Sequence, residues 1–66
     1  MTLGQKIALL RKEKGLTQVE FAKKFNIDKS TVAKYETDKI LPSIPMLVIL
    51  SKFFEVSADY LLGLED

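Results

Sequence analysis

The 66-residue sequence contains no cysteine, no histidine and no tryptophan. Without cysteine the chain can form no disulfide and no thiolate nucleophile. Without histidine it lacks the commonest general base and the commonest metal ligand. The serines, threonines and carboxylates that remain have none of the usual partners that activate a nucleophile. We therefore expect no metal site and no cofactor, and an enzyme is the least favoured functional class.

Long hydrophobic runs are absent too, since no stretch approaches the roughly 20 apolar residues that a membrane-spanning helix requires. The start, MTLGQKIALLRK, lacks the pattern of a signal peptide. We therefore expect a cytoplasmic location and no membrane partner. The chain has 47% apolar and 29% charged residues, as soluble globular proteins do. Its length leaves room for one domain, residues 1–66, with one small core.

The net charge of +1 hides an uneven distribution along the chain. Residues 1–39 hold nine lysines and arginines against five acidic residues, a balance of +4. Residues 40–66 hold one lysine against four acidic residues, a balance of −3. This asymmetry suggests a basic face for a polyanion and an acidic end directed away from it. On charge alone, an accidental spread of solvated side chains is an equal alternative.

Glycine occurs only three times and proline twice, and a few turn-forming residues divide the chain into five short helical segments. The first carries an apolar stripe and ends near Gly15, which suits a left-handed helix terminus. The second opens with a capping box, in which Thr17 and Glu20 satisfy early backbone N–H groups, and it stops at Asn26. Asp28 is the expected N-cap of the third segment, which extends to about position 36.

Serine caps introduce the last two segments. Ser43 precedes a strongly apolar helix with Pro45 in its first turn, and Ser57 precedes a short helix that ends near Gly63. No stretch alternates with period two for long enough to favour a strand, and there is no repeat or linker. The sequence predicts an all-α fold, a five-helix bundle with short loops.

The second and third segments have the residue sizes that a helix-turn-helix requires. Ala22 is small where the two helices face each other, and Asn26 offers a left-handed turn. At 100° per residue, Val32 and Tyr35 fall on the inward side of the third segment. These features predict a crossed pair of helices rather than an ordinary helical hairpin.

The outward side of the third segment is polar. Eight helical residues span about 12 Å, which matches the width of the major groove of DNA. Lysine donates to guanine O6 and N7, and hydroxyl groups donate to or accept from several bases. The alternative is a helix face that is merely solvated, in which serine and threonine support the helix start through backbone bonds. The candidate base-contacting residues are Lys29, Ser30, Thr31 and Lys34.

The segment TQVEFAKKFNIDKSTVAKYE resembles the helix-turn-helix of the Xre/Cro/CI-like family of phage and bacterial transcriptional regulators. LGQKIALLRKEKGLTQ resembles the family's first helix, and LPSIPMLVILSKFFEVSADYLLG its last two. The resemblance implies a lambda-repressor-like domain of five helices, with the helix-turn-helix at helices 2 and 3. The implied function is a sequence-specific regulator, a repressor that binds a palindromic double-stranded DNA operator as a homodimer, with helix 3 in the major groove.

The resemblance also implies roles for single residues. Gln18 matches a glutamine that typically holds the DNA backbone at the start of helix 2, where free N–H groups favour phosphate. Arg11 and Glu36 match a pair that forms a buried salt bridge between helices 1 and 3 in some relatives. The helical periodicity independently places both residues on inward stripes.

The chain departs from the family pattern after helix 3. Thr37-Asp38 replaces the frequent Asn-Gly, which brings a negative charge near the expected phosphate. Lys39 follows directly and is the candidate phosphate contact that compensates for it. Apolar residues also stand where the family often has basic ones, before the proline at position 42.

Three apolar residues form a possible dimer surface, Ile40, Leu41 and Leu64. A twofold dimer would set two recognition helices about 34 Å apart, one turn of DNA. Packing of the loop against its own core is the alternative. Two other functions stay open: an antitoxin-type module that binds a protein through helix 4, and a protein-interaction domain that does not bind DNA. No small-molecule site is evident.

Overall fold

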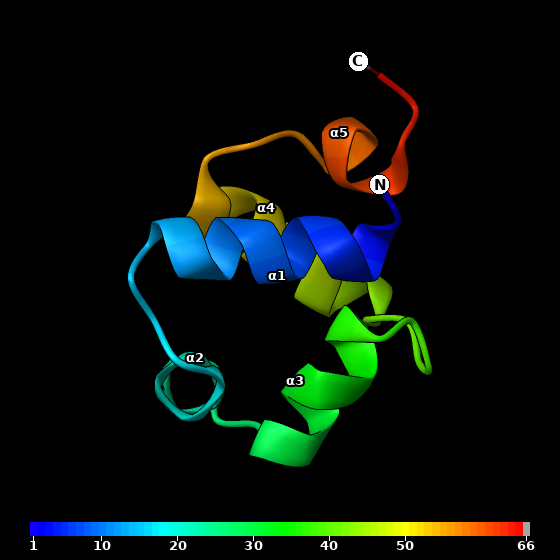
Figure 1. Ribbon diagram of the computed structural model, residues 1–66. Helices are drawn as coiled ribbons and strands as arrows, with labels where there is room; N and C mark the ends of the chain where they lie inside the picture. Colours follow the sequence, from blue (N-terminus) through cyan, green and yellow to red (C-terminus); the bar gives the residue numbers. More distant parts are fainter. Residues whose placement is uncertain (66) are drawn as a thin grey trace.

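The computed structural model describes residues 1–65. Figure 1 shows α1 across the middle of the molecule, with α2 and α3 on one side and α5 on the other. α1 packs against α3 and α5, α2 packs against α3, and α4 packs against α5. The predicted all-α fold of five helices is confirmed. The helices are α1 (Leu3–Glu13), α2 (Gln18–Lys24), α3 (Lys29–Glu36), α4 (Ile44–Phe54) and α5 (Ala58–Leu62).

One hydrophobic core receives side chains from all five helices. Phe21 of α2 lies fully buried, with its ring stacked on that of Phe54 at 5.7 Å and packed edge-on against that of Phe25 at 4.8 Å. Such aromatic pairs add to the stabilisation that comes from buried area. The buried apolar residues are Ile7, Phe21, Ala22, Val32, Tyr35, Leu47, Leu50, Phe54 and Leu61.

Side-chain caps start four of the five helices. The predicted capping box of Thr17 and Glu20 is present, and so are the predicted caps by Ser43 and Ser57. A further capping box at Thr2 starts α1, which the sequence did not predict. Within the described residues, no helix has both the length and the apolar character needed to cross a membrane.

Each of the five helices ends with one residue in the left-handed region, followed by an N–H that bonds back to a carbonyl five residues earlier. This Schellman arrangement satisfies carbonyl groups that the helix leaves free. The predicted positions near the ends of α1, α2 and α5 are confirmed. The sequence missed the other two, which hold acidic residues. The left-handed residues are Gly15, Asn26, Asp38, Glu55 and Gly63.

Candidate nucleic-acid interface

The α2–α3 pair has the geometry that the sequence predicts. Ala22 is 3% exposed at the crossing of the helices, and its carbonyl accepts a hydrogen bond from the N–H of Ile27 at 3.0 Å. Asn26 adopts φ 54° in the turn. Val32 and Tyr35 are buried and hold the inner side of α3 against the core. The orientation of α3 is therefore fixed by the turn and by two apolar anchors.

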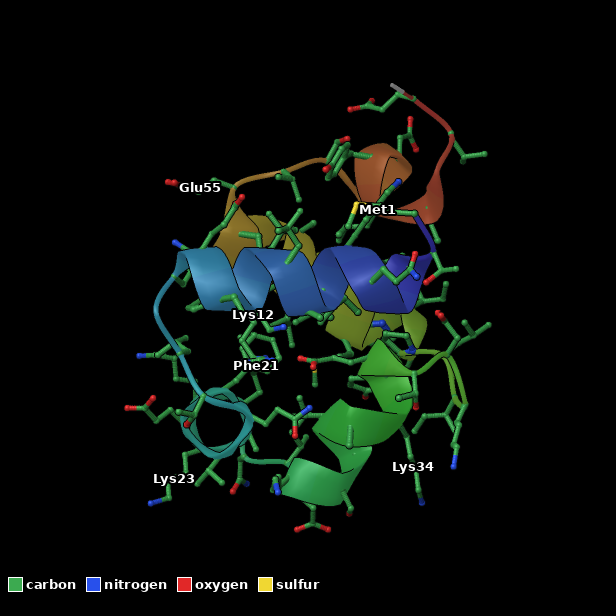
Figure 2. All side chains as sticks on the ribbon, in the orientation of Figure 1. Met1, Lys12, Phe21, Lys23, Lys34 and Glu55 are labelled. Atoms are coloured by element: carbon green, nitrogen blue, oxygen red, sulfur yellow. The ribbon has the colours of Figure 1, made fainter. Side chains whose placement is uncertain are left out.

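The outer side of α3 points away from the rest of the bundle. Lys29, Ser30 and Lys34 are exposed, whereas Thr31 is half-buried. Figure 2 shows the side chain of Lys34 extending outward from α3. Three of the four candidate base-contacting residues are thus exposed and accessible to a partner.

Two further exposed lysines lie in α2. Lys23 and Lys24 are exposed in the last turn of α2, and Figure 2 shows Lys23 pointing outward on the side of the molecule that carries α2 and α3. The sequence pattern pointed to them only through the net charge. Their place in the last turn of a helix next to the recognition helix was the signal that could have identified them as candidate phosphate contacts.

The predicted ion pair between α1 and α3 is confirmed. Arg11 Nε lies 2.6 Å from Glu36 Oε2, and its Nη2 lies 3.1 Å from Glu36 Oε1. The guanidinium also donates to the carbonyl of Leu16 at 2.6 Å. The two side chains are 8% and 7% exposed. The pair is therefore bidentate and shielded from water, the arrangement in which an arginine–carboxylate contact is strongest.

Gln18 joins this ion pair from α2. Its Nε2 donates to Glu36 Oε1 at 3.0 Å, so one carboxylate binds side chains from two other helices. The sequence did not predict this bond. An amide nitrogen has two N–H groups, and the bond to Glu36 leaves one of them for another acceptor. Gln18 is half-buried and therefore held in a defined position at the start of α2.

Asp38 lies at the start of α1. Its Oδ1 accepts from the N–H of Gly4 at 2.9 Å and its Oδ2 from the hydroxyl of Thr2 at 2.6 Å. A carboxylate at a helix N-terminus also interacts favourably with the helix dipole. The carboxylate that the sequence placed near the expected phosphate is therefore hydrogen-bonded to other residues of the protein. Lys39, the next residue, is exposed.

Gly4 allows this close approach of α1 to α3. A Cβ atom at Gly4 would lie 2.3 Å from the carbonyl oxygen of Tyr35 and 2.8 Å from that of Glu36. No real side chain tolerates such a contact with backbone. The glycine is needed here for space rather than for a left-handed conformation.

The candidate dimer residues are all exposed. Ile40 and Leu41, in the loop before α4, are 41% and 75% exposed, and Leu64, after α5, is 72% exposed. The loop therefore does not bury Ile40 and Leu41 in its own core. Ile44 and Val48, one turn apart on α4, are 74% and 42% exposed and were not included in the prediction. An apolar strip therefore runs from the α3–α4 loop onto the outer face of α4.

Comparison with known proteins gives matches over most of the chain. The family model described as Helix-turn-helix matches residues 7–61. An uncharacterized HTH-type transcriptional regulator of Bacillus subtilis (strain 168), YobD, is 42% identical over 62 residues, which are 94% of this chain and 55% of that protein. The immunity repressor protein of Bacillus phage phi105 is 37% identical over 65 residues, 98% of this chain and 45% of that protein. The chain thus spans about half the length of these curated relatives.

The fold is similar to that of a repressor bound to DNA. The crystal structure of the P22 c2 repressor protein in complex with a synthetic operator superposes with a TM-score of 0.85 at 27% sequence identity. The similarity covers 94% of this chain and 94% of that one. The lambda-repressor-like architecture implied by the resemblance is confirmed.

Proposed function

Because this chain belongs to the helix-turn-helix family, we propose that it is the sequence-specific DNA-binding domain of a transcriptional regulator. The observation that carries the proposal is α3, which is held by Val32, Tyr35 and Glu36 on one side and presents exposed Lys29 and Lys34 on the other. In this proposal α3 lies in the major groove of double-stranded DNA. The protein acts in the cytoplasm and is not an enzyme.

Two sets of residues make two kinds of contact with DNA in this proposal. Gln18 and Lys39 contact phosphates, which supply most of the affinity and its salt dependence. Lys29, Ser30, Thr31 and Lys34 contact base edges, which supply the choice of sequence. The bond from Gln18 to Glu36 supports the first role, because it orients the amide and keeps one N–H for a phosphate oxygen.

We further propose that two copies bind a palindromic operator and repress transcription by occupying it. The immunity repressor among the relatives and the operator complex of the P22 c2 repressor support repression. The exposed Ile40, Leu41 and Leu64 support a twofold interface, which we extend to Ile44. A twofold dimer would present its two α3 helices about 34 Å apart to successive half-sites.

One observation favours a second function. The apolar strip on the α3–α4 loop and α4 would also fit a different protein, as an antitoxin-type module requires. However, Asp38 was the main feature against DNA binding, and its carboxylate is occupied by α1. DNA binding is therefore the better-supported function.

Selection of bound oligonucleotides from a random pool tests the proposal. At low salt, and at concentrations that allow dimers, we expect an enriched motif with two related half-sites. Lys52→Ala, which removes an exposed lysine from the last turn of α4, should select the same motif. Recovery of no motif would contradict sequence-specific binding. A motif with one half-site would contradict only the dimer.

A further inference from the structure

Four carboxylates lie within or next to the α2–α3 pair, and the structure gives three of them partners. Glu20 accepts from a backbone N–H in its capping box, Glu36 pairs with a guanidinium, and Asp38 caps the start of α1. Asp28 is exposed, and its side chain makes no capping hydrogen bond. The only ion pair among residues 1–65 is the one that involves Glu36. Asp28 is thus the carboxylate of this region that is free to bind a ligand.

The backbone explains why the side chain of Asp28 is not used as a cap. The N–H of Thr31, which a capping carboxylate would bind, donates instead to the backbone carbonyl of Asp28 at 3.0 Å. The N–H of Val32 donates to the same carbonyl at 3.2 Å. The sequence assigned Asp28 to capping and regarded Asp38 as the charge near DNA. Asp28 is the N-cap residue of α3 as predicted, but its side chain makes no capping hydrogen bond, whereas the side chain of Asp38 is bonded to the start of α1.

Asp28 immediately precedes α3 at the end where a recognition helix contacts base edges. In the major groove, a carboxylate accepts a hydrogen bond from the N4 amino group of cytosine. It is repelled by O6 and N7 of guanine and by O4 of thymine. Adenine offers an amino group, but its N7 acceptor lies next to it. Cytosine is therefore the base that an aspartate at this position fits best.

We propose that Asp28 is a specificity-determining residue that selects a cytosine in each half-site, beside the base that Lys29 contacts. This inference rests on the proposed function and adds a negative contact to an otherwise basic surface. Because phosphates repel a carboxylate, Asp28 weakens binding to every sequence, and only a cytosine amino group at the right place offsets the loss. Its larger effect is on the choice of sequence, and its general effect on affinity is a smaller loss.

Asp28→Asn tests the proposal, because asparagine caps helices as well as aspartate does and has no charge. Oligonucleotide selection with the original chain should enrich cytosine at one position of each half-site. Asparagine pairs with N6 and N7 of adenine, so the variant should shift that preference from cytosine to adenine by about tenfold. Its affinity for random duplex at low salt should rise by about threefold. Asp59→Asn, the same change in the first turn of α5, should leave the motif unchanged.

Two other outcomes would overturn the proposal in different ways. If Asp28→Asn selects the same motif and binds every sequence equally well or more weakly, then Asp28 only supports the start of α3. A fall in the melting temperature of Asp28→Ala, which removes the capping group altogether, would identify that structural role directly. If the original chain enriches no motif, the proposed function itself fails, and the inference about Asp28 fails with it.

Discussion

The two ends of the molecule are held together by different kinds of contact. In the part where α2 and α3 meet α1, side-chain hydrogen bonds with defined directions join one helix to another. Glu36 binds Arg11 in the last turn of α1 and Gln18 of α2, and Asp38 binds the start of α1.

In the described residues, a single side-chain bond links α5 to α1, from Lys6 Nζ to the carbonyl of Tyr60 at 2.6 Å. α4 and α5 otherwise attach mainly through apolar packing, with cation–π contacts from Lys6 to Tyr60 and from Lys14 to Phe53. Directional hydrogen bonds thus hold α3, the helix that must be oriented, and largely non-directional packing holds α4 and α5.

Removing the guanidinium from the directional part should have the largest effect. Arg11→Met leaves the carboxylate of Glu36 buried without its cation, which should lower the free energy of unfolding by about 3–5 kcal/mol. Lys12→Met, on the exposed neighbouring residue, is the control. Urea denaturation measures both. A loss below about 1 kcal/mol for Arg11→Met would show that the ion pair does not hold α3 to α1.

The outer face of α3 should affect DNA binding without affecting stability. Lys34→Ala should weaken operator binding by about 1–3 kcal/mol and relax the preference at one base position. Gln18→Ala should weaken binding more evenly across sequences, because a phosphate contact carries no base information. Fluorescence anisotropy with the selected operator and with single-base variants separates the two patterns. Equal effects of Lys34→Ala on all sequences would assign Lys34 to the phosphates.

Two contributions of Asp38 to stability can be separated, the hydrogen bonds of its side chain to α1 and the left-handed conformation of its backbone. Asp38→Ala removes the bonds to Thr2 and Gly4 and keeps a Cβ atom at φ 61°, so it should lower stability by about 1–2 kcal/mol. Asp38→Gly loses the same bonds but relieves the left-handed conformation by about 1 kcal/mol. The melting temperature of Asp38→Gly should therefore be higher than that of Asp38→Ala. The opposite ranking would contradict the role of the left-handed turn.

A substitution in the exposed apolar surface should change self-association of the protein rather than its folding stability. Leu41→Ser, at a residue 75% exposed, should leave the melting temperature unchanged and weaken dimer formation by about tenfold. Leu9→Ser, at a residue of α1 that is 39% exposed and lies outside the candidate dimer surface, is the control. Sedimentation over a concentration series, with and without operator, measures the effect. Unchanged association of Leu41→Ser would exclude this residue from the interface.

The smallest effect concerns pH. The backbone hydrogen bond in the capping box lowers the pKa of Glu20 below its ordinary value of 4.5. A lowered pKa in the folded state means that ionised Glu20 stabilises the fold above pH 4.5, and that this contribution disappears as the pH falls through the lower, folded-state value. Glu20→Gln should therefore reduce the acid sensitivity of the melting temperature slightly. Identical pH dependence of the melting temperature for Glu20→Gln and for the original chain below pH 5 would contradict the prediction.

Most features that depend on neighbouring residues were predictable from the sequence, although the capping box at Thr2 and the left-handed Glu55 were missed. Most features that depend on distant residues were not predictable. Ser43 and Ser57 cap the helices that follow them, and Gly15 ends the first helix, because each acts within its own turn. The left-handed conformation of Asp38 was missed because its side chain is bonded to residues more than 30 positions away. No local pattern contains that information.

The candidate site shows the same limit. The pairing of Arg11 with Glu36 followed from two inward stripes and from the family resemblance, and the structure confirms it. Gln18 also binds the carboxylate of Glu36. This contact depends on the distance between the start of α2 and the end of α3, which helical periodicity does not give. The free side chain of Asp28 depends on which oxygen accepts the N–H of Thr31. The DNA contacts themselves stay predictions.

The separation of the two sides of α3 has a consequence for how such domains diverge. The residues that orient the helix, Val32, Tyr35 and Glu36, are buried among other helices, whereas Lys29 and Lys34 are exposed to solvent. Substitutions at the exposed positions can therefore accumulate without lowering stability or rotating the helix. Descendants of one ancestral chain can acquire new target sequences by a few surface changes while they keep the same scaffold.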